Sequence, residues 1–485
     1  MLCEIPALPY GASVCDTRCI RTVEATRARP RDAVGAGCFA DPGRSTLPGA
    51  APLQAPPFLR QSIAVATQRW SLRTGVKATD RATGENPRTV VFWATIAALG
   101  AFLYWRLFAM FAQLPPAKKA GSTGLTIYHH AGEALLRGEI PYRDYFIEYP
   151  PGSLLAFVPP ALFSSNRGAY SELFAIEMAL AVVGSLVLLA LAARRFWGPW
   201  AYIIPAATFT AAAIPFYNLI MARYDAVVTL TLAVSTLCVA LGGRYVLIAY
   251  ASLGFGAAAK LIPALATLPL ATLRKGAARG YAAFFAVLLL FFAPPLMLAS
   301  EGLIKSFVYQ ADRGLQVESL AASVLLKLGR VSRIGFGHGA YEVRGSDVEF
   351  VSSLSFPITA VLLVITALVM YREYRLGYLK LEQYPRYAAA LILAYMLGSR
   401  VLSPQFMLWL LPLVPLAGKR FVKIIISAVF LAACASTRLL LLHYSDLLEL
   451  RFPAPDLLLA RNLLLVLLWV LLLLVRDKTS DERPP

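Results

Sequence analysis

Apolar segments recur along this chain from Val90 to Val475 and leave little sequence between them. Each is close to, or somewhat shorter than, the roughly 20 residues that a helix needs to cross the roughly 30 Å apolar core of a bilayer. Hydrophobic residues make up 58% of the 485 and charged residues only 15%, a balance that excludes an ordinary water-soluble domain. We therefore expect an all-α polytopic membrane protein, in which the shorter segments form broken or paired helices.

The positions of the basic residues predict which loops face the cytoplasm. The formal net charge is +18, and Lys and Arg are concentrated in short loops, which is typical of cytoplasmic segments rather than of a nucleic-acid-binding surface. These basic segments are Arg194-Arg195, Arg244, Arg274 to Arg279, Arg372 to Arg386, Lys419 to Lys423 and the tail from Arg476. Segments of balanced charge alternate with them and are expected to face outward. They are Gln113 to Pro151, Asn218 to Tyr224, and Ser300 to about Phe350.

About twelve spans, with both termini in the cytoplasm, satisfy this alternation. The predicted spans are 90–112, 171–193, 200–217, 224–241, 245–259, 260–272, 280–299, 354–371, 387–400, 404–417, 421–442 and 457–475. The apolar run from Ser153 to Phe163 is left over, too short to cross and interrupted by Pro159 and Pro160. We expect it to dip into the outer leaflet beside a functional site. If this run crossed instead, Arg194 and Arg195 would face outward.

The first 88 residues differ in composition from the rest. They contain nine prolines and four of the six cysteines, and they lack an apolar run long enough for a signal peptide or a span. We expect a disordered cytoplasmic tail over 1–88, a membrane domain over 90–475 and a second cytoplasmic tail over 476–485. The cysteines lack the spacing of a zinc site. An alternative is a translation start near Val76, since no methionine lies between Met1 and Met110.

Reactive side chains are densest in the first outward loop. Residues 124–138 have apolar side chains at helical spacing and end in a glycine, so an amphipathic surface helix that presents His129 is predicted. The segment PYRDYFIEYPPG follows at 141–152 and leads into the short apolar run. Its prolines are suited to starting a helical turn, whose free amide groups can bind a phosphate.

Two carboxylates four residues apart, Asp144 and Glu148, are the best candidates for a catalytic base in this loop, with Arg143 and Tyr149 beside them as substrate contacts. The alternative is a structural role, because tyrosines at a membrane interface often form aromatic belts. In that case Arg143 simply pairs with one of the two carboxylates.

Ionisable residues at or inside apolar spans are costly and usually functional or paired. Arg223 and Asp225 lie at the start of one span, where a mutual structural pair is an equal alternative to substrate binding. Lys260 lies where two short spans meet at the outer face, and it is the stronger candidate for binding a lipid phosphate; the alternative is snorkelling.

Two other outward segments carry candidates for sugar contacts. These are Arg313, Gln316 and Glu318 in the long outer loop, and Arg400 and Gln405 at another span mouth. The polar groups at the span mouth are as compatible with satisfying a helix end. We expect His338, Glu342 and Asp347, later in the long loop, to form an ordinary solvated stretch.

The first outward loop resembles that of the glycosyltransferase C superfamily, most closely glycosyltransferase family 87, the polyprenol-phosphate-mannose-dependent mannosyltransferase-like proteins. The resemblance rests on the sequence YHHAGEALLRGEIPYRDYFIEYPPGSLLAFVPPAL. It continues in order through Ala222–Ala233, Gly254–Leu270, Asp312–Leu325 and Val401–Leu413, within residues 90–475. One departure is that many relatives carry an aspartate just before the surface helix, where this chain has the sequence GSTG at 121–124.

The resemblance implies a glycosyltransferase C fold in a bacterial-type plasma membrane, with the active site on the outer face. It implies transfer of a sugar, mannose by family, from a polyprenyl-phosphate-linked donor to a lipid-linked or cell-wall glycan acceptor, with inversion. An acidic residue of the first loop is the expected base, which leaves Glu148 or Asp144, and Arg143, Lys260 and Arg313 are the expected phosphate and sugar contacts. No D-x-D pattern suggests a metal, and we expect no cofactor, no obligatory metal and no nucleic-acid partner.

Two other classes and a degenerate family member stay open. A lipid or glycan transporter would also have about twelve spans, but inverted repeats are not evident. An O-antigen ligase or polymerase would place its important side chains in a late outer loop, which the segment 300–350 allows and the YPPG element does not favour. The missing aspartate also allows a family member without catalytic activity.

Overall fold

The computed structural model of the protein describes residues 87–113, 123–273 and 277–475. The expectations for residues 1–86, for a start near Val76, for positions 121 and 122 and for the tail 476–485 lie outside this range. The described part is mostly helical, as predicted.

Seven helical stretches among the described residues are long and apolar enough to cross a membrane. They are α2 (Pro87–Ala112), α6 (Arg167–Trp197), the run of α7 (Ile203–Ala213), η3 (Ile214–Phe216) and α8 (Tyr217–Ala222), α12 (Ala277–Leu298), α15 (Val348–Ser353) with α16 (Ser355–Arg375), α19 (Arg420–Leu442) and α21 (Ala454–Leu474). Each overlaps a predicted span.

The remaining apolar stretches are shorter. They are η2 (Pro151–Ser153) with α5 (Leu154–Phe163), α9 (Asp225–Leu241), α10 (Tyr245–Ala259), η4 (Ile262–Ala266) with α11 (Thr267–Leu273), η5 (Leu381–Gln383) with α17 (Tyr384–Gly398), and η6 (Pro404–Phe406) with α18 (Met407–Leu410) and η7 (Val414–Leu416). Several of them begin with or contain a proline. Proline cannot donate the backbone hydrogen bond of a helix interior, so these segments stay short. Helix length alone therefore accounts for seven crossings rather than twelve.

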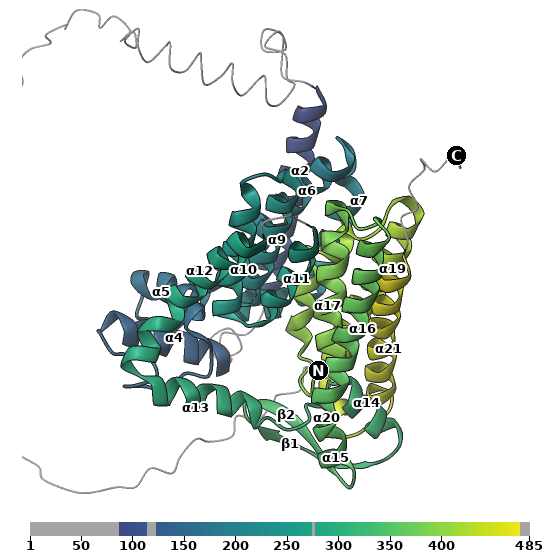
Figure 1. Ribbon diagram of the computed structural model, residues 1–485. Helices are drawn as coiled ribbons and strands as arrows, with labels where there is room; N and C mark the ends of the chain where they lie inside the picture. Colours follow the sequence, from purple (N-terminus) through teal and green to yellow (C-terminus); the bar gives the residue numbers. More distant parts are fainter. Residues whose placement is uncertain (1–86, 114–122, 274–276, 476–485) are drawn as a thin grey trace, which may run out of the picture. The chain divides into compact units, whose positions relative to one another are not determined.

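The helices pack in two sequential groups. In the first, α6 packs on α9, α9 on α10, and α10 on α12. In the second, α16, α17, α19 and α21 lie side by side (Figure 1). Almost every residue of α17 is buried, which matches a helix that is apolar on all faces.

The helix predicted at 124–138 is present as α4 (Thr123–Leu136), which packs on α5. Gly152, in the turn η2, lies against the backbone at the end of α10, where a Cβ would come within 2.6 Å of Ala258 C and 2.7 Å of Ala259 N. Only glycine allows this approach. The PPG turn thereby fixes the first loop beside Lys260, the residue that follows α10.

The long loop before α15 contains the helices α13 (Ser300–Ala311) and α14 (Leu320–Lys327) and an antiparallel hairpin of β1 (Val331–Gly337) and β2 (Ala340–Gly345) (Figure 1). The hairpin turn is His338-Gly339, with φ of 47° and 73°, as a two-residue hairpin turn requires. The short helix α20 (Tyr444–Leu448) joins α19 to α21. The hairpin is the one departure from an all-α fold in the described residues.

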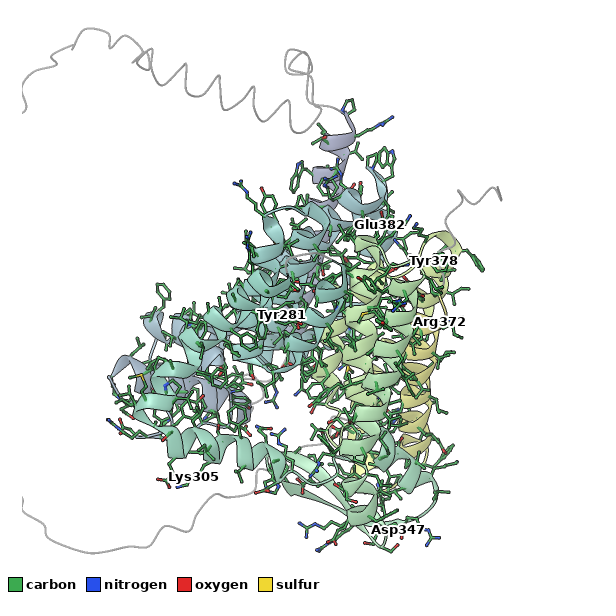
Figure 2. The ribbon with its side chains drawn as sticks, in the orientation of Figure 1. Tyr281, Lys305, Asp347, Arg372, Tyr378 and Glu382 are labelled. Atoms are coloured by element: carbon green, nitrogen blue, oxygen red, sulfur yellow. The ribbon has the colours of Figure 1, made fainter. Side chains whose placement is uncertain are left out.

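Charged side chains mark opposite ends of the second group of helices. Figure 2 places Asp347 near one end and Tyr378 and Glu382 near the other. Asp347 precedes α15 and Arg372 lies in the last turn of α16, so these residues flank one apolar stretch. This arrangement fits the prediction that the segments 300–350 and 372–386 face opposite sides.

Candidate active site

A buried ion pair lies where α9 begins and α10 ends. Lys260 Nζ is 2.7 Å from Asp225 Oδ1, and the indole Nε1 of Trp409 donates to the same oxygen at 2.7 Å. The Asp225 side chain is 1% exposed and that of Lys260 is 20% exposed. A buried carboxylate needs such partners, because an unpaired charge away from water is very costly.

Aromatic rings surround the Lys260 ammonium. Its nitrogen lies 5.1 Å from the ring centres of Tyr224 and Trp409 and 5.3 Å from that of Phe406. Cation–π contacts of this kind hold an ammonium group in a dry site. The Tyr224 ring also contacts Tyr149 at 5.4 Å, so the first loop and the lysine share one aromatic cluster.

A second ion pair joins the first loop to the long loop. Arg313 Nη2 donates to Glu148 Oε2 at 3.2 Å, and the Gln310 side chain donates to the Glu148 carbonyl at 3.0 Å. The two charged side chains are 18% and 10% exposed. Glu148 Oε1 has no hydrogen-bond partner among the described residues. Tyr149, the neighbour of Glu148, contacts the Tyr224 ring that lies 5.1 Å from the Lys260 nitrogen, so the two ion pairs adjoin one aromatic cluster.

The segment that carries Arg313 is held by the predicted sugar contacts themselves. Arg400 Nη1 donates to the carbonyls of Ala311 and Arg313 at 3.2 and 3.1 Å. The backbone N–H of Gln316 donates to the Arg400 carbonyl at 2.9 Å, and the side-chain Nε2 of Gln316 donates to Ser403 Oγ at 3.0 Å. Gln316 and Arg400 therefore position Arg313.

Glu318 lies deeper than Arg313 and is 4% exposed. Its Oε1 accepts a hydrogen bond from the Tyr444 hydroxyl at 2.7 Å. Burial raises the pKa of the Glu318 carboxyl, and the Tyr444 hydroxyl partly offsets this effect. Glu318 therefore anchors the long loop to α20.

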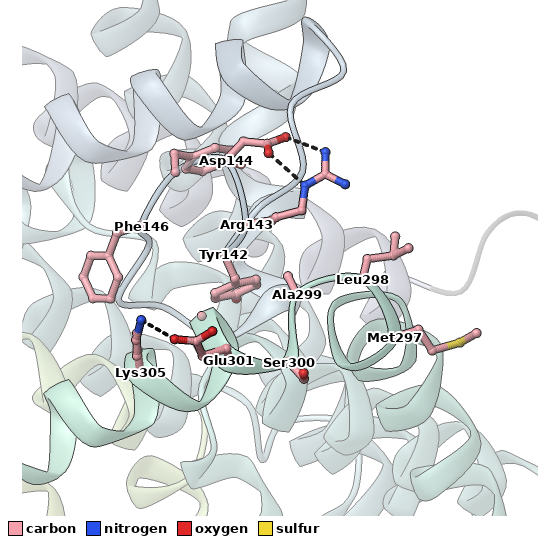
Figure 3. A pocket seen from close by; sticks show the side chains of 12 residues that line it. Tyr142, Arg143, Asp144, Phe146, Met297, Leu298, Ala299, Ser300, Glu301 and Lys305 are labelled. Atoms are coloured by element: carbon pink, nitrogen blue, oxygen red, sulfur yellow. Dashed lines mark hydrogen bonds and ion pairs between the residues drawn. The ribbon is translucent and has the colours of Figure 1, made fainter.

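Asp144 lies apart from these ion pairs. Its Oδ1 accepts from Arg143 Nε at 2.8 Å, and its Oδ2 accepts from Arg143 Nη2 at 3.0 Å and from the Ile140 amide at 2.8 Å. These hydrogen bonds, first that from Arg143, hold the pKa of Asp144 below its usual range. Asp144 lines a separate pocket of about 530 Å³, opposite the Lys305–Glu301 ion pair (Figure 3).

Arg223 lies beside a tyrosine, whereas Asp225 pairs with Lys260. The Arg223 guanidinium and the Tyr128 hydroxyl both adjoin Gly124, where a Cβ would collide with the guanidinium and come within 3.3 Å of the hydroxyl oxygen. Gly124, within the GSTG sequence that replaces an aspartate of many relatives, thus leaves room for Arg223. The Tyr128 ring contacts Tyr149 at 5.5 Å, so Arg223 lies next to the aromatic cluster.

The other predicted residues lie around this cluster. The Tyr149 carbonyl accepts from the Tyr142 hydroxyl at 2.6 Å, which fixes the loop on either side of Glu148. His129 Nε2 is 3.4 Å from Glu133 on the same helix, and its ring contacts Tyr170. Gln405 is half-buried and directly precedes Phe406, one of the rings around Lys260.

The sequence model of glycosyltransferase family 87 matches residues 146–404, more than half of the chain. The chain belongs to glycosyltransferase family 87. The match includes both ion pairs, Glu148–Arg313 and Asp225–Lys260, and it begins after Asp144. The resemblance that the first loop and the later stretches predicted is confirmed.

Comparison with curated proteins and with solved structures gives distant similarity alone. No curated protein matches the chain. Among solved structures, this family 87 chain is similar to ArnT from Cupriavidus metallidurans in the apo state, with a TM-score of 0.38 and 13% sequence identity over 79% of this chain and 76% of that one.

Membership of family 87 and the apolar helices make the protein a multi-pass membrane glycosyltransferase. Family membership therefore excludes the alternative of a lipid or glycan transporter. Sequence analysis missed Trp409 and Phe406 beside Lys260, although both lie in the segment Val401–Leu413 that carried part of the resemblance. Sequence analysis also predicted that Glu342 belongs to a solvated stretch, and this prediction is wrong. The structure has that side chain 12% exposed, accepting from the Gly314 amide at 2.9 Å, with His338 Nδ1 3.0 Å away.

Proposed function

We propose that the protein transfers mannose from a polyprenyl-phosphate-linked donor to a lipid-linked or cell-envelope glycan acceptor, with inversion at the anomeric carbon. The observation that carries this proposal is the meeting of a carboxylate, Glu148, with two buried or half-buried cations, Lys260 and Arg313, beside one aromatic cluster. Such a transfer needs one base for the acceptor and fixed positive charge for the departing phosphate.

Glu148 is the proposed base. Its Oε1, without a partner among the described residues, takes the proton of the acceptor hydroxyl as the hydroxyl oxygen attacks the anomeric carbon. Asp144 is the less suitable candidate because both of its oxygens are engaged by Arg143 and the Ile140 amide, and its lowered pKa makes it a weaker base.

Lys260 and Arg313 are the proposed contacts of the donor phosphate, where negative charge grows as the bond to the sugar breaks. Asp225 and Trp409 hold the lysine, so the ammonium needs little reorganisation at the moment of reaction. Tyr149, Arg223 and Gln405 are proposed to line the sugar-binding region, and His129 to lie at its edge.

The proposed topology has twelve spans. Some of these spans consist of short helical segments in succession instead of one long helix. Both termini lie in the cytoplasm of a bacterial-type plasma membrane, and the site opens outward. The basic loops support this orientation.

The test is reconstitution of the purified full chain in nanodiscs with a lipid extract from cells lacking the gene. Polyprenyl-phosphate mannose is the donor, polyprenyl-phosphate glucose is the comparison, and products are read by mass spectrometry. An acceptor heavier by one hexose with the mannose donor alone supports the proposal. Use of the glucose donor instead overturns the sugar assignment, and retained transfer by Glu148→Gln overturns the base.

A further inference from the structure

Three polar side chains that the proposed reaction does not use are buried together where α14, α20 and α21 meet. Glu318 is 4% exposed, and Arg461 and Asn462, neighbours on α21, are both 0% exposed. Buried apolar side chains of the same region form one cluster that includes Leu315, Leu447 and Leu458. A glutamate and an arginine in such a place need hydrogen-bond partners for all their polar atoms.

Some of these atoms have partners. The Asn462 Nδ2 group donates to Ser323 Oγ at 3.0 Å and to the Ser319 carbonyl at 3.2 Å, which identifies it as the nitrogen of the amide. Arg461 Nη2 donates weakly to the Glu318 carbonyl at 3.4 Å. These bonds fix the three side chains in place.

Four atoms of the same side chains are buried without any partner. Two of them, Glu318 Oε2 and Asn462 Oδ1, are acceptors, and two, Arg461 Nε and Nη1, are donors. The Glu318 carboxylate and the Arg461 guanidinium do not pair directly, although both belong to the described part of the chain and interact electrostatically. A buried polar group left unsatisfied destabilises the fold, and a charged one does so more strongly.

The two acceptors and two donors without partners indicate which kind of ligand fits this site. A metal cation would be repelled by Arg461, and an anion would be repelled by Glu318. Protonation of Glu318 would remove its charge but would leave both Arg461 donors and the Asn462 acceptor unsatisfied. A water molecule donates twice and accepts twice, so it complements two acceptors and two donors.

We propose that ordered internal water occupies this site and links the Glu318 carboxylate, the Asn462 amide oxygen and the Arg461 guanidinium into one network. This water completes the anchor of the loop segment whose other end carries Arg313. The inference does not rest on the proposed function, because it uses only the buried groups themselves.

The test is an experimental structure of the full chain in lipid nanodiscs, at about 2 Å, where bound water is visible elsewhere in the map. We expect a density peak within about 2.7–3.2 Å of both Glu318 Oε2 and an Arg461 nitrogen. The control in the same map is the buried Ser235–Tyr384 pair, which is directly bonded at 2.7 Å and leaves no orphan atom. A direct Glu318–Arg461 ion pair without a peak between the two side chains would overturn the proposal.

Discussion

Arg313 donates a hydrogen bond to Glu148 across 3.2 Å and so joins two loops that are 165 residues apart in sequence. The arginine comes at the start of a segment fixed by Arg400, whose guanidinium bonds its carbonyl. The glutamate comes from a loop fixed by the Tyr142–Tyr149 hydrogen bond. Because these hydrogen bonds fix the segments that carry both partners, the pair has little freedom to move. This suits a site that must act without reorganisation.

The replacement Glu148→Gln is expected to reduce transfer by roughly 100- to 10,000-fold, the usual contribution of a general base. The amide keeps the size and can still accept from Arg313, so the protein should stay folded in the membrane. Transfer is measured as the hexose-extended lipid in cells that lack the chromosomal gene and carry the variant.

The matched comparison for this change is Asp144→Asn, which lies in the same loop and removes the same charge. We expect it to retain most of the activity, because Asp144 lines the pocket beside Lys305, away from the two ion pairs, and both its oxygens already bond Arg143. Loss of transfer in Asp144→Asn with retention in Glu148→Gln would reverse the assignment.

The replacement Lys260→Met should lower transfer about 100-fold or more, similar to the loss of one fixed donor in an anion-stabilising site. It also leaves the buried Asp225 carboxylate without its cation, so we expect unfolding to become easier by about 3–5 kcal/mol. Transfer in membranes and the apparent melting temperature in detergent measure the two effects.

Lys305→Met is the control lysine. Its side chain is 66% exposed and pairs with an exposed glutamate, so its loss should change stability by no more than about 0.5 kcal/mol. Equal effects of the two lysine replacements on transfer would contradict a special role for Lys260.

Much of the helical framework could be predicted from sequence, because apolar runs and basic loops report directly on membrane crossing. The helix at 124–138, the short run at 153–163 and the position of Lys260 between two short helical segments follow from local patterns. The partner of Asp225 could not be predicted in the same way. Sequence proximity favours Arg223. However, Arg223 directly follows α8 and Asp225 begins α9, and Asp225 pairs with Lys260, 35 residues away.

Two other features escaped prediction for related reasons. The hairpin β1–β2 contains several glycines, which weaken a strand pattern, and its pairing depends on the His338-Gly339 turn. Trp409 lies 184 residues from Asp225, and in sequence it is one apolar residue among many. Its role depends on a single indole N–H group that periodicity does not reveal.

The replacement Trp409→Phe is expected to cost roughly 1.5–3 kcal/mol of stability, because it removes one of two donors to a buried carboxylate. Transfer should fall with it, since the Lys260 ammonium loses part of its support. Trp469→Phe is the control: that indole donates to the Thr366 hydroxyl at 3.1 Å, a neutral bond worth about 1 kcal/mol, and lies outside the proposed site. If both variants transferred sugar equally well, Trp409 would have only a packing role.

The replacement Gly152→Ala tests whether the PPG turn positions the first loop. The new Cβ would meet the end of α10 at 2.6–2.8 Å, so the turn must move away from the residue just before Lys260. We expect a stability loss of about 1–3 kcal/mol, typical of overpacking, and a larger loss of transfer than stability alone explains. Gly184→Ala in α6 is the control, because its Cβ would meet Leu230 at an ordinary 3.6 Å and alanine favours the helix. Wild-type transfer by Gly152→Ala would show that the loop reaches its position without this contact.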